Sequence, residues 1–308
     1  MPALAALVNG DYDLLSVWTQ PDRPAGRGRK VRHSPVAEWA VEHGLPLEQP
    51  LTLRSPETLR RLTEYNAEVV VLAAYGLIVP RAGLEAVPLG WVNIHPSLLP
   101  RHRGASPVAA PILAGESATG VTLFQMTPGL DDGPVLAQEP VAILPDETTG
   151  ELTDRLAQVG AEMLPTTLEA WRRGEIVPSR QDDERATYAP KLTREESLLN
   201  WSDPAEVLAR QVRAYNPWPA AYTWFSGERL RVLRARSVAG PTGPPGLVSR
   251  DGETGYPAVR CGEGTLLLLE VQGAGGKPLD GRDYLRGRRA LEGAVLGGQD
   301  ASAPKSGS

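Results

Sequence analysis

The sequence predicts an α/β protein in which a mostly parallel, Rossmann-like sheet is followed by a small, OB-like β-barrel. Three observations lead to this prediction. The chain has 308 residues, a length that suggests two domains. Strand-like and helix-like segments alternate over its first two-thirds, as they do in a parallel sheet flanked by helices. Short β-like runs broken by glycine and proline then follow, a pattern typical of a small barrel.

Serine–proline pairs mark the helix starts of the first part. Each pair puts a hydroxyl that can cap the helix before a proline whose fixed φ suits the first helical turn. The helices predicted from these pairs cover residues 34–43, 55–65 and 106–113. Apolar and β-branched runs predict strands over residues 14–18, 67–74, 92–95 and 120–126. The run at 67–74 is apolar enough to be buried on both faces of a sheet.

The second half begins with a long helix, predicted over residues 149–173, with a kink at Pro165 and a stop at Gly174. A polar, charged stretch follows, and then a short helix over 204–215. Further strands and a last helix are predicted at residues 222–225, 229–233, 257–261, 265–271 and 280–289. We therefore expect a first domain, a linker, a barrel domain and a disordered tail, at residues 1–176, 177–199, 200–296 and 297–308.

The bulk composition excludes several classes of protein. The chain is 41% hydrophobic and 22% charged, which is ordinary for a globular protein. Its formal net charge of −5 argues against a protein that merely coats nucleic acid, although a local basic patch is compatible with it. No apolar run reaches the ~20 residues that span a bilayer. The single cysteine, Cys261, excludes an internal disulfide and fits a reducing cytosol, so we expect a cytoplasmic protein with Cys261 as a small buried strand residue.

The most informative residues are Asn93 and His95. They alternate with apolar residues in a predicted strand, so their side chains share one face. Further along, Asp131 lies in a tight turn bounded by Gly129 and Gly133. An amide that can donate to an oxyanion, an imidazole that can take a proton and a carboxylate that can orient the imidazole are the groups that an acyl-transfer site needs. The other histidines show no metal-ligand spacing and no dinucleotide or phosphate-loop motif occurs, so we expect no metal and no such cofactor.

Two longer motifs contain these residues and resemble a known family. The run NIHPSLLPRHRG at 93–104, followed by GLDDG at 129–133, resembles the formyltransferases that use 10-formyltetrahydrofolate. The run TQPDRPAGRG at 19–28 narrows the resemblance to the members that formylate methionyl initiator tRNA. The run RAYNPWP at 213–219 is similar to the start of their C-terminal barrel. The resemblance extends from about residue 3 to residue 291 and implies transfer of a formyl group from the folate to the α-amine of methionine on this tRNA, in translation initiation.

The resemblance also implies roles for individual residues. Catalysis would fall to Asn93, His95 and Asp131, with the adjacent Asp132 as the alternative carboxylate. The 10-formyltetrahydrofolate would be bound by Tyr75, Gly76, Leu77, Ile78, Ser97, Leu98, Pro100, Thr127, Gly129 and Leu130. The tRNA would be bound by Arg23, Arg27, Arg29, Lys30, Arg213, Arg229 and Arg231. The loop that contains Arg27 would enter the acceptor arm of the tRNA. No metal would take part, and the family resemblance suggests a monomer.

The physical chemistry of these residues agrees with such roles but allows simpler ones. His95 can accept the proton of the amine near neutral pH, Asn93 can donate to the developing oxyanion, and Asp131 can orient the imidazole and position a water molecule. The basic run at 23–32 is glycine- and proline-rich, so we expect a flexible loop rather than a helix, and many such runs are merely solvated surface. The alternation of Arg229 and Arg231 predicts that both lie on one face of a strand.

The arginines of the barrel leave two interpretations open: they increase solubility, or they form a second tRNA-binding surface. We favour the second, because a protein with a negative net charge needs its positive charge concentrated where an anion binds. We expect Trp218 and Trp224 to pack in the barrel core rather than to stack on bases. Two alternatives to the whole functional interpretation also remain. One is a sugar or purine formyltransferase, or a formyl-folate hydrolase, with the same three side chains. The other is a non-catalytic RNA-binding module built on a β-barrel.

The start of the chain departs from the family pattern. In the family a strand that ends in a Gly-Thr-Pro turn precedes a helix resembling residues 3–7, whereas here Met1 and Pro2 lead almost directly into that helix. We therefore expect that the first, central strand is absent and that two strands keep unpaired hydrogen-bonding edges. We also expect the true start of the protein to lie upstream of Met1.

Overall fold

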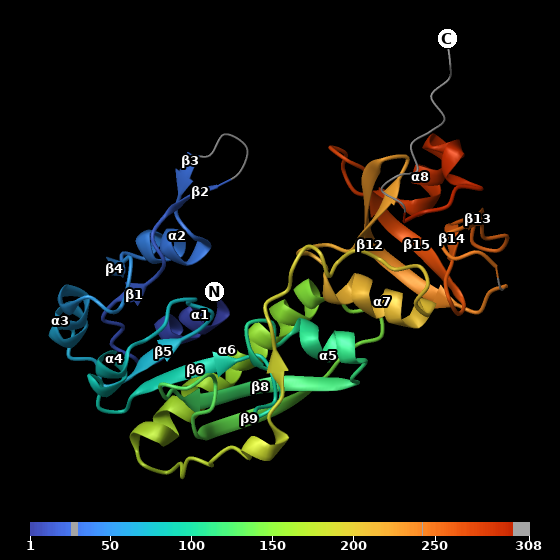
Figure 1. Cartoon of the computed structure of the whole chain (residues 1–308). Helices are drawn as coiled ribbons and strands as arrows, with labels where there is room; N and C mark the ends of the chain where they lie inside the picture. Colours follow the sequence, from blue (N-terminus) through green and yellow to red (C-terminus); the bar gives the residue numbers. More distant parts are fainter. Residues whose placement is uncertain (26–29, 242, 298–308) are drawn as a thin grey trace. The chain divides into compact units, whose positions relative to one another are not determined.

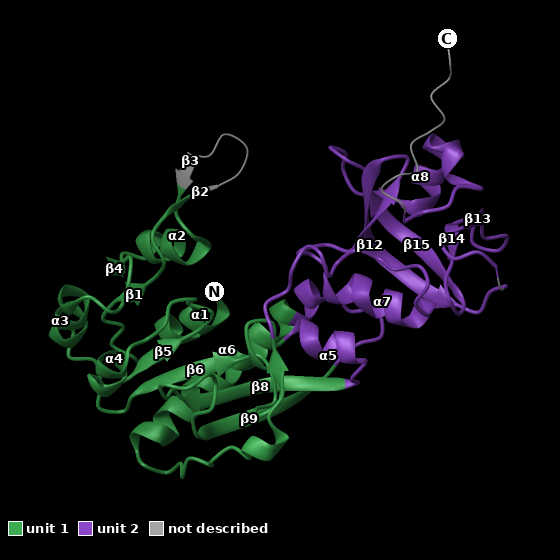
Figure 2. Cartoon of the chain, viewed as in Figure 1, with its two compact units in different colours: residues 1–107, 118–142, 153–189 green, residues 108–117, 143–152, 190–308 purple. Residues whose placement is uncertain are grey.

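A computed structural model of the chain describes residues 1–25, 30–241 and 243–297. The chain divides into two compact units (Figures 1 and 2). Unit 1 comprises residues 1–107, 118–142 and 153–189, and unit 2 comprises residues 108–117, 143–152 and 190–308. The predicted disordered tail lies, apart from Gly297, outside the described residues. In the part of the chain that is described, no helix is long and apolar enough to cross a membrane.

Unit 1 is built around a four-stranded sheet in the order β5-β6-β8-β9. These strands are β5 (Val70–Leu72), β6 (Trp91–His95), β8 (Ala118–Gln125) and β9 (Val135–Ala142). β5 and β6 are parallel, whereas β6, β8 and β9 pair antiparallel. The predicted α/β class with a parallel sheet element and an antiparallel C-terminal domain is confirmed. β9 was not predicted, because its run of alternating half-exposed residues carries few of the apolar signals of a buried strand.

A second, separate sheet lies in unit 1. It consists of β1 (Val17–Trp18) and β4 (Leu47–Glu48), which pair in parallel. Within the described residues β1 has only β4 as a strand partner, and β5 has only β6. The expectation of two strands with an unpaired edge agrees with this arrangement. The prediction that the run at 67–74 is buried on both faces is wrong: β5 is half-buried, as an edge strand is.

Helices cover both faces of the four-stranded sheet. On one face, Leu7 of α1 (Pro2–Asn9) and Leu164 and Leu168 of α6 (Thr149–Arg172) pack with Val92 and Leu123. On the other, α3 (Pro56–Glu64) and α4 (Arg81–Glu85) contribute to a core that includes Trp91. The predicted serine caps are present in α2 (Pro35–Glu42) and α3, where Ser34 and Ser55 accept hydrogen bonds from Ala37 N and Thr58 N. The third predicted start is wrong, because α5 (Ala109–Ala114) begins two residues after Pro107 without a side-chain cap.

Unit 2 contains a curled antiparallel sheet in the order β11-β12-β15-β14-β13, with β16 paired to β15 (Figure 1). Its strands are β11 (Tyr222–Phe225), β12 (Glu228–Val238), β13 (Val248–Arg250), β14 (Pro257–Arg260), β15 (Thr265–Gln272) and β16 (Leu279–Asp280). Leu208 and Val212 of α7 (Ala205–Ala214) share its core with Leu230 and Val232. Cys261 is buried there, as predicted, and burial raises the pKa of its thiol to about 11. α8 (Gly281–Gly287) and a short 3-10 helix (Arg289–Leu291) complete the unit.

The stretch predicted as a linker makes ordered contacts in its first part. A 3-10 helix (Asp183–Arg185) is followed by β10 (Tyr188–Ala189), which pairs in parallel with β7 (Arg103–Gly104). Residues up to 189 belong to unit 1. The predicted domain boundaries stay predictions, but residues 177–189, called the bracing segment below, are not a free connection.

Gly120 generates a prediction about the sheet. A Cβ atom at this position of β8 would lie 2.3 Å from the Glu139 carbonyl oxygen and 2.5 Å from Leu98 Cδ2. Because the first neighbour is backbone of the adjacent strand, Gly120→Ala should lower the free energy of unfolding by about 1–3 kcal/mol, measured by urea denaturation. Gly252→Ala is the control, since nothing lies within 4 Å of its Cβ position. Equal urea midpoints for the two variants would contradict this prediction.

Candidate active site

Asn93 and His95 lie on one face of β6, as their alternation predicts. The intervening Ile94 packs into the core on the opposite face, beneath α1 and α6. Asn93 is 8% exposed and His95 is 4% exposed. Within the described residues the carboxamide of Asn93 makes no hydrogen bond, so its N–H groups are available to an incoming oxygen.

The ring of His95 is held by one backbone group. Its Nε2 atom lies 3.0 Å from the carbonyl oxygen of His102. A carbonyl oxygen can only accept, so the neutral ring carries its proton on Nε2 and keeps a lone pair on Nδ1. Phe124 of β8 packs edge-on against the ring, with 6.3 Å between the ring centres. Nδ1 is therefore the nitrogen that can take a proton.

The turn that carries Asp131 returns across the sheet to reach His95. β8 runs antiparallel to β6 and ends opposite Val92, and the chain then folds back so that Asp131 Oδ2 lies 3.8 Å from His95 Nδ1. The same oxygen accepts a 2.8 Å hydrogen bond from Gly104 N. Asp132 instead is exposed and accepts a hydrogen bond from the hydroxyl of Thr127. The carboxylate beside the imidazole is thus that of Asp131.

The two largest effects on the pKa of His95 oppose each other. Burial lowers the pKa of the imidazole below its ordinary value, and this effect is larger than that of the Asp131 carboxylate, which raises the same pKa. The ring is therefore neutral at neutral pH. It is ready to accept a proton, and the nearby negative charge stabilises the imidazolium that results.

The bracing segment was not recognised as part of this site. Gln181 is buried and its Nε2 donates to the carbonyl oxygens of Asp131, at 2.8 Å, and Gly133, at 2.7 Å. Its Oε1 accepts from Nε and Nη2 of Arg103, at 3.1 and 2.8 Å. The hydroxyl of Thr187 accepts a 2.8 Å hydrogen bond from His102 N. One segment therefore fixes both the carboxylate turn and the carbonyl that orients the imidazole.

One signal in the sequence could have found this segment. Arg103 lies in the run that also holds His95, and in the structure it is 3% exposed. A buried guanidinium needs several acceptors, and none lies near it in the sequence. The polar stretch beyond residue 176 is rich in acceptors, and in the structure Gln181 and Asp183 of this stretch accept hydrogen bonds from Arg103.

The segments predicted to bind the folate follow β5, β6 and β8. Tyr75 packs in the core below β5 with a buried hydroxyl that has no hydrogen-bond partner in the described chain, and burial raises its pKa to about 12. Ser97 is buried and donates to Arg101 O at 2.7 Å, so its hydroxyl is already engaged. Leu98 packs against Gly120. The remaining predicted residues follow the same strands: Gly76, Leu77, Ile78, Pro100, Thr127, Gly129 and Leu130.

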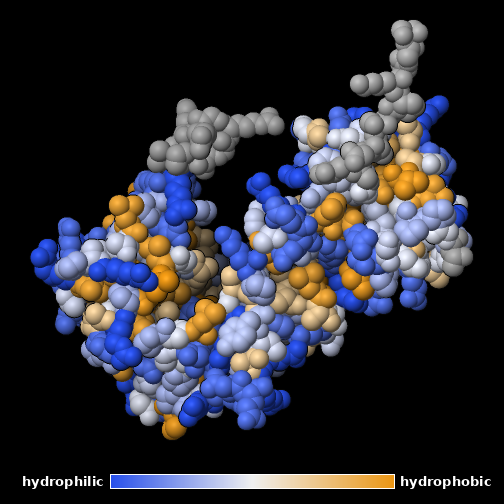
Figure 3. Space-filling model, viewed as in Figure 1, coloured by the Kyte–Doolittle hydropathy of each residue, from blue (hydrophilic) through white to orange (hydrophobic). Residues whose placement is uncertain are grey.

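Two of these residues leave large apolar groups in solvent. Ile78 is 71% exposed and Leu130 is 58% exposed. In the space-filling view, orange apolar groups lie in several separate places among the blue polar surface of both units (Figure 3). No group of three or more metal-ligating side chains occurs in the described part of the chain.

The basic residues near the N-terminus fall partly outside the described residues. Arg27 and Arg29 are not described. Where a loop was expected, the flanking residues form a two-stranded antiparallel ribbon of β2 (Arg23–Ala25) and β3 (Lys30–Arg32). Arg23 donates to Gln20 Oε1 at 2.8 Å.

The barrel arginines differ in their surroundings. Arg213 of α7 is half-buried and donates to Glu147 O at 3.3 Å, and burial lowers its pKa. Arg234 and Arg236 of β12 form ion pairs with Glu151 and Asp146. All of these contacts lie within unit 2. Arg229 and Arg231 share one face of β12 as predicted, and Arg229 is half-buried whereas Arg231 is exposed.

The fold and the site together define an acyl-transfer enzyme, and comparisons with known proteins make that class specific. A family model described as "Formyl transferase" matches residues 4–168, and one described as "Formyl transferase, C-terminal domain" matches residues 191–289. The methionyl-tRNA formyltransferase of Chloroflexus aggregans is 47% identical over 293 residues, 94% of each chain. That of Thiobacillus denitrificans is 47% identical over 299 residues, 96% of this chain and 95% of its own. The chain belongs to the methionyl-tRNA formyltransferase family.

Solved structures show the same fold at lower identity. HypX from Aquifex aeolicus, in complex with tetrahydrofolic acid, matches with a TM-score of 0.60 and 20% identity, over 80% of this chain and 43% of its own. The N-formyltransferase from Helicobacter canadensis, in complex with folinic acid and dTDP-3-aminofucose, matches with a TM-score of 0.62 and 16% identity, over 88% and 94%. At such identities the likeness concerns the fold alone.

The bracing segment yields a prediction about His95. Gln181→Ala removes the two hydrogen bonds that Gln181 donates to the Asp131 turn, so the carboxylate that raises the His95 pKa should move away from the ring. The His95 pKa, followed by NMR titration, should then fall further below its ordinary value, and the free energy of unfolding should drop by about 1–3 kcal/mol.

The matched control for that variant is Glu184→Ala, an exposed side chain of the same segment. It should leave both quantities unchanged. If the His95 pKa is unchanged in Gln181→Ala, the prediction is wrong, and the Asp131 turn keeps its position without Gln181.

Proposed function

We propose that this chain transfers the formyl group of 10-formyltetrahydrofolate to the α-amine of the methionine carried by initiator tRNA, a step of translation initiation in the cytoplasm. Membership of the family and the arrangement of Asn93, His95 and Asp131 support the proposal. The observation that carries most weight is the pairing of a buried, neutral imidazole with a carboxylate 3.8 Å away. A folate molecule would bind against Tyr75, Ile78 and Leu130, and it would supply an activated formyl group.

Each side chain of the trio then has one role. His95 Nδ1 accepts the proton that the amine loses as it adds to the formyl carbon. Asp131 stabilises the imidazolium, and His95 can return the proton to the departing nitrogen. The Asn93 N–H group donates to the formyl oxygen as negative charge develops on it, and loss of such a donor costs about 10²–10³ in turnover. No covalent bond to the enzyme forms, so no nucleophilic side chain is needed.

The enzyme would act as a monomer, and basic side chains would bind the tRNA. Arg23, Arg27, Arg29 and Lys30 would contact it from unit 1, and Arg229 and Arg231 from unit 2. Arg213 is left out of this set because it is half-buried and bonded to a carbonyl of its own chain. Contacts of this kind to phosphates make affinity fall as salt rises.

The direct test of the activity is single-turnover formylation. With 10-formyltetrahydrofolate as donor, the protein should formylate methionyl initiator tRNA and leave a free amino sugar unchanged. Activity on the sugar alone would assign the chain to the sugar formyltransferases. Tight binding of tRNA without any turnover would favour a binding module instead.

The two adjacent carboxylates give a prediction with a defined sign. The amine's proton can be taken only by neutral His95, so kcat should fall as pH drops through a pKa that lies below the ordinary 6.5. Asp131 raises that pKa, so Asp131→Asn should shift the acid limb of the kcat profile to lower pH. The same change should reduce kcat by about 10²- to 10⁴-fold.

Asp132→Asn is the control for this experiment, because Asp132 is exposed and bonded to Thr127. It should keep both the rate and the pH profile of the original protein. The assignment is refuted if Asp132→Asn abolishes activity while Asp131→Asn leaves it intact.

A further inference from the structure

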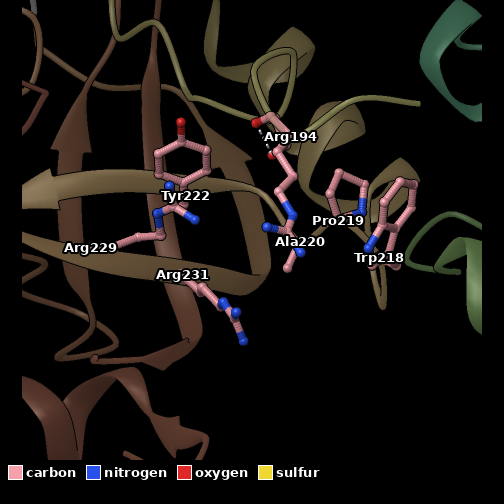
Figure 4. A pocket seen from close by; sticks show the side chains of 8 residues that line it. Arg194, Trp218, Pro219, Ala220, Tyr222, Arg229 and Arg231 are labelled. Atoms are coloured by element: carbon pink, nitrogen blue, oxygen red, sulfur yellow. Dashed lines mark hydrogen bonds between the residues drawn. The ribbon is translucent and has the colours of Figure 1, made fainter. Parts of the chain in front are cut away.

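Unit 2 contains a pocket whose lining is rich in arginine. Arg194, Arg229 and Arg231 line it together with Trp218 and Tyr222, and its volume is about 130 Å³ (Figure 4). No carboxylate lines it. The positive groups come from two parts of the unit, since Arg194 precedes α7 and the other two belong to β12. The pocket therefore gathers positive charge in a chain whose net charge is −5.

The charges in this pocket are not neutralised by the protein. Among the described residues, Arg194, Arg229 and Arg231 form no ion pair with a carboxylate. Their neighbours on β12 do: Arg234 pairs with Glu151 and Glu270, and Arg236 pairs with Asp146. Arg231 donates to the neutral Gln272 Oε1 at 3.2 Å. Three uncompensated guanidinium groups around one hollow attract an anion.

Two aromatic rings beside the pocket hold the guanidinium of Arg229 in position. The guanidinium carbon of Arg229 lies 4.1 Å from the centre of the Tyr222 ring, beside which Figure 4 shows it, and 5.6 Å from the centre of the Trp224 ring. Both rings therefore make cation–π contacts with Arg229. The N–H groups point outward in the plane of a guanidinium and stay free to donate. An oxyanion with several acceptor oxygens matches such donors, because guanidinium groups bind phosphate through paired hydrogen bonds.

The size of the pocket limits what enters it. On this measure of volume a single water molecule needs about 10–15 Å³, whereas pockets that enclose drug-sized ligands measure about 300–1,000 Å³, so a pocket of 130 Å³ lies between the two. That space admits a phosphate group but not a whole nucleotide. A base attached to the phosphate would have to lie outside.

Trp218 provides a surface for such a base. It was predicted to lie in the barrel core, and this prediction is wrong: its side chain is 50% exposed and lines the pocket. It lies between Pro217 and Pro219, each preceded by a cis peptide bond. Exposed aromatic rings beside a cationic groove are the usual platform on which unpaired bases stack.

We propose that this pocket holds one backbone phosphate of the tRNA and that an unpaired base next to that phosphate stacks on Trp218. This inference rests on the proposed function, because it takes the partner to be the tRNA substrate. It adds a particular subsite: a phosphate held by Arg194, Arg229 and Arg231, and a single-stranded nucleotide beside Trp218. A free nucleotide offers the same chemistry, and the experiment separates the two sources.

The test measures the Kd for methionyl initiator tRNA at several salt concentrations, without formyl donor. Trp218→Ala should raise Kd by about 5- to 100-fold, the range expected for loss of one stacked base, with the salt dependence unchanged. Trp218→Phe should recover most of this loss. Arg194→Ala should raise Kd and reduce the slope of log K against log salt by about one, as loss of one phosphate contact does.

The matched control is Arg250→Ala, which removes an exposed arginine of the same unit outside the pocket. Pocket variants that bind tRNA as tightly as Arg250→Ala would overturn the proposal. Adenosine monophosphate is the probe for the other source: if it binds at micromolar concentration and Arg194→Ala abolishes that binding while tRNA affinity is unchanged, the pocket serves free nucleotides and the proposal is wrong. Because these are binding measurements, they remain informative even if the protein fails to formylate the tRNA, so the two proposals can fail separately.

Discussion

The hydrogen bond from His95 Nε2 to the His102 carbonyl oxygen fixes the chemistry of the site. It places the proton of the neutral ring on Nε2 and turns the lone pair of Nδ1 toward Asp131. Asp131 therefore stabilises the protonated, positively charged imidazole across 3.8 Å. It does not accept a hydrogen bond from the neutral imidazole. The sequence predicts that Asp131 orients the imidazole, whereas in the structure the carbonyl oxygen of His102 orients it.

That backbone carbonyl is itself held from a distant part of the chain. Thr187 accepts a hydrogen bond from His102 N, and its own carbonyl accepts one from Arg103 N at 2.9 Å. Gln181 holds the turn of Asp131. Burial lowers the pKa of His95 and the carboxylate opposes this, so small movements of either support alter the protonation of the base.

The sequence predicted the parts of the protein whose cause is local. Alternation in β6 placed Asn93 and His95 on one face, and two serine–proline pairs gave capped helices, because side-chain direction and capping depend on neighbouring residues. The bracing segment could not be predicted in this way, since the contact between Gln181 and Asp131 joins residues 50 apart in the chain. Trp218 was misjudged because composition cannot tell whether an aromatic residue near a barrel faces its core or solvent.

The most direct measurement is the tautomer of His95, read from the ¹⁵N chemical shifts of the imidazole nitrogens above the pKa of the ring. The chain has only four histidines, so comparison with His95→Gln assigns the signals. A protonated Nε2 and an unprotonated Nδ1 would agree with a base oriented by the His102 carbonyl. A proton on Nδ1 in the neutral ring would contradict it, because that lone pair would then be absent from the side facing Asp131.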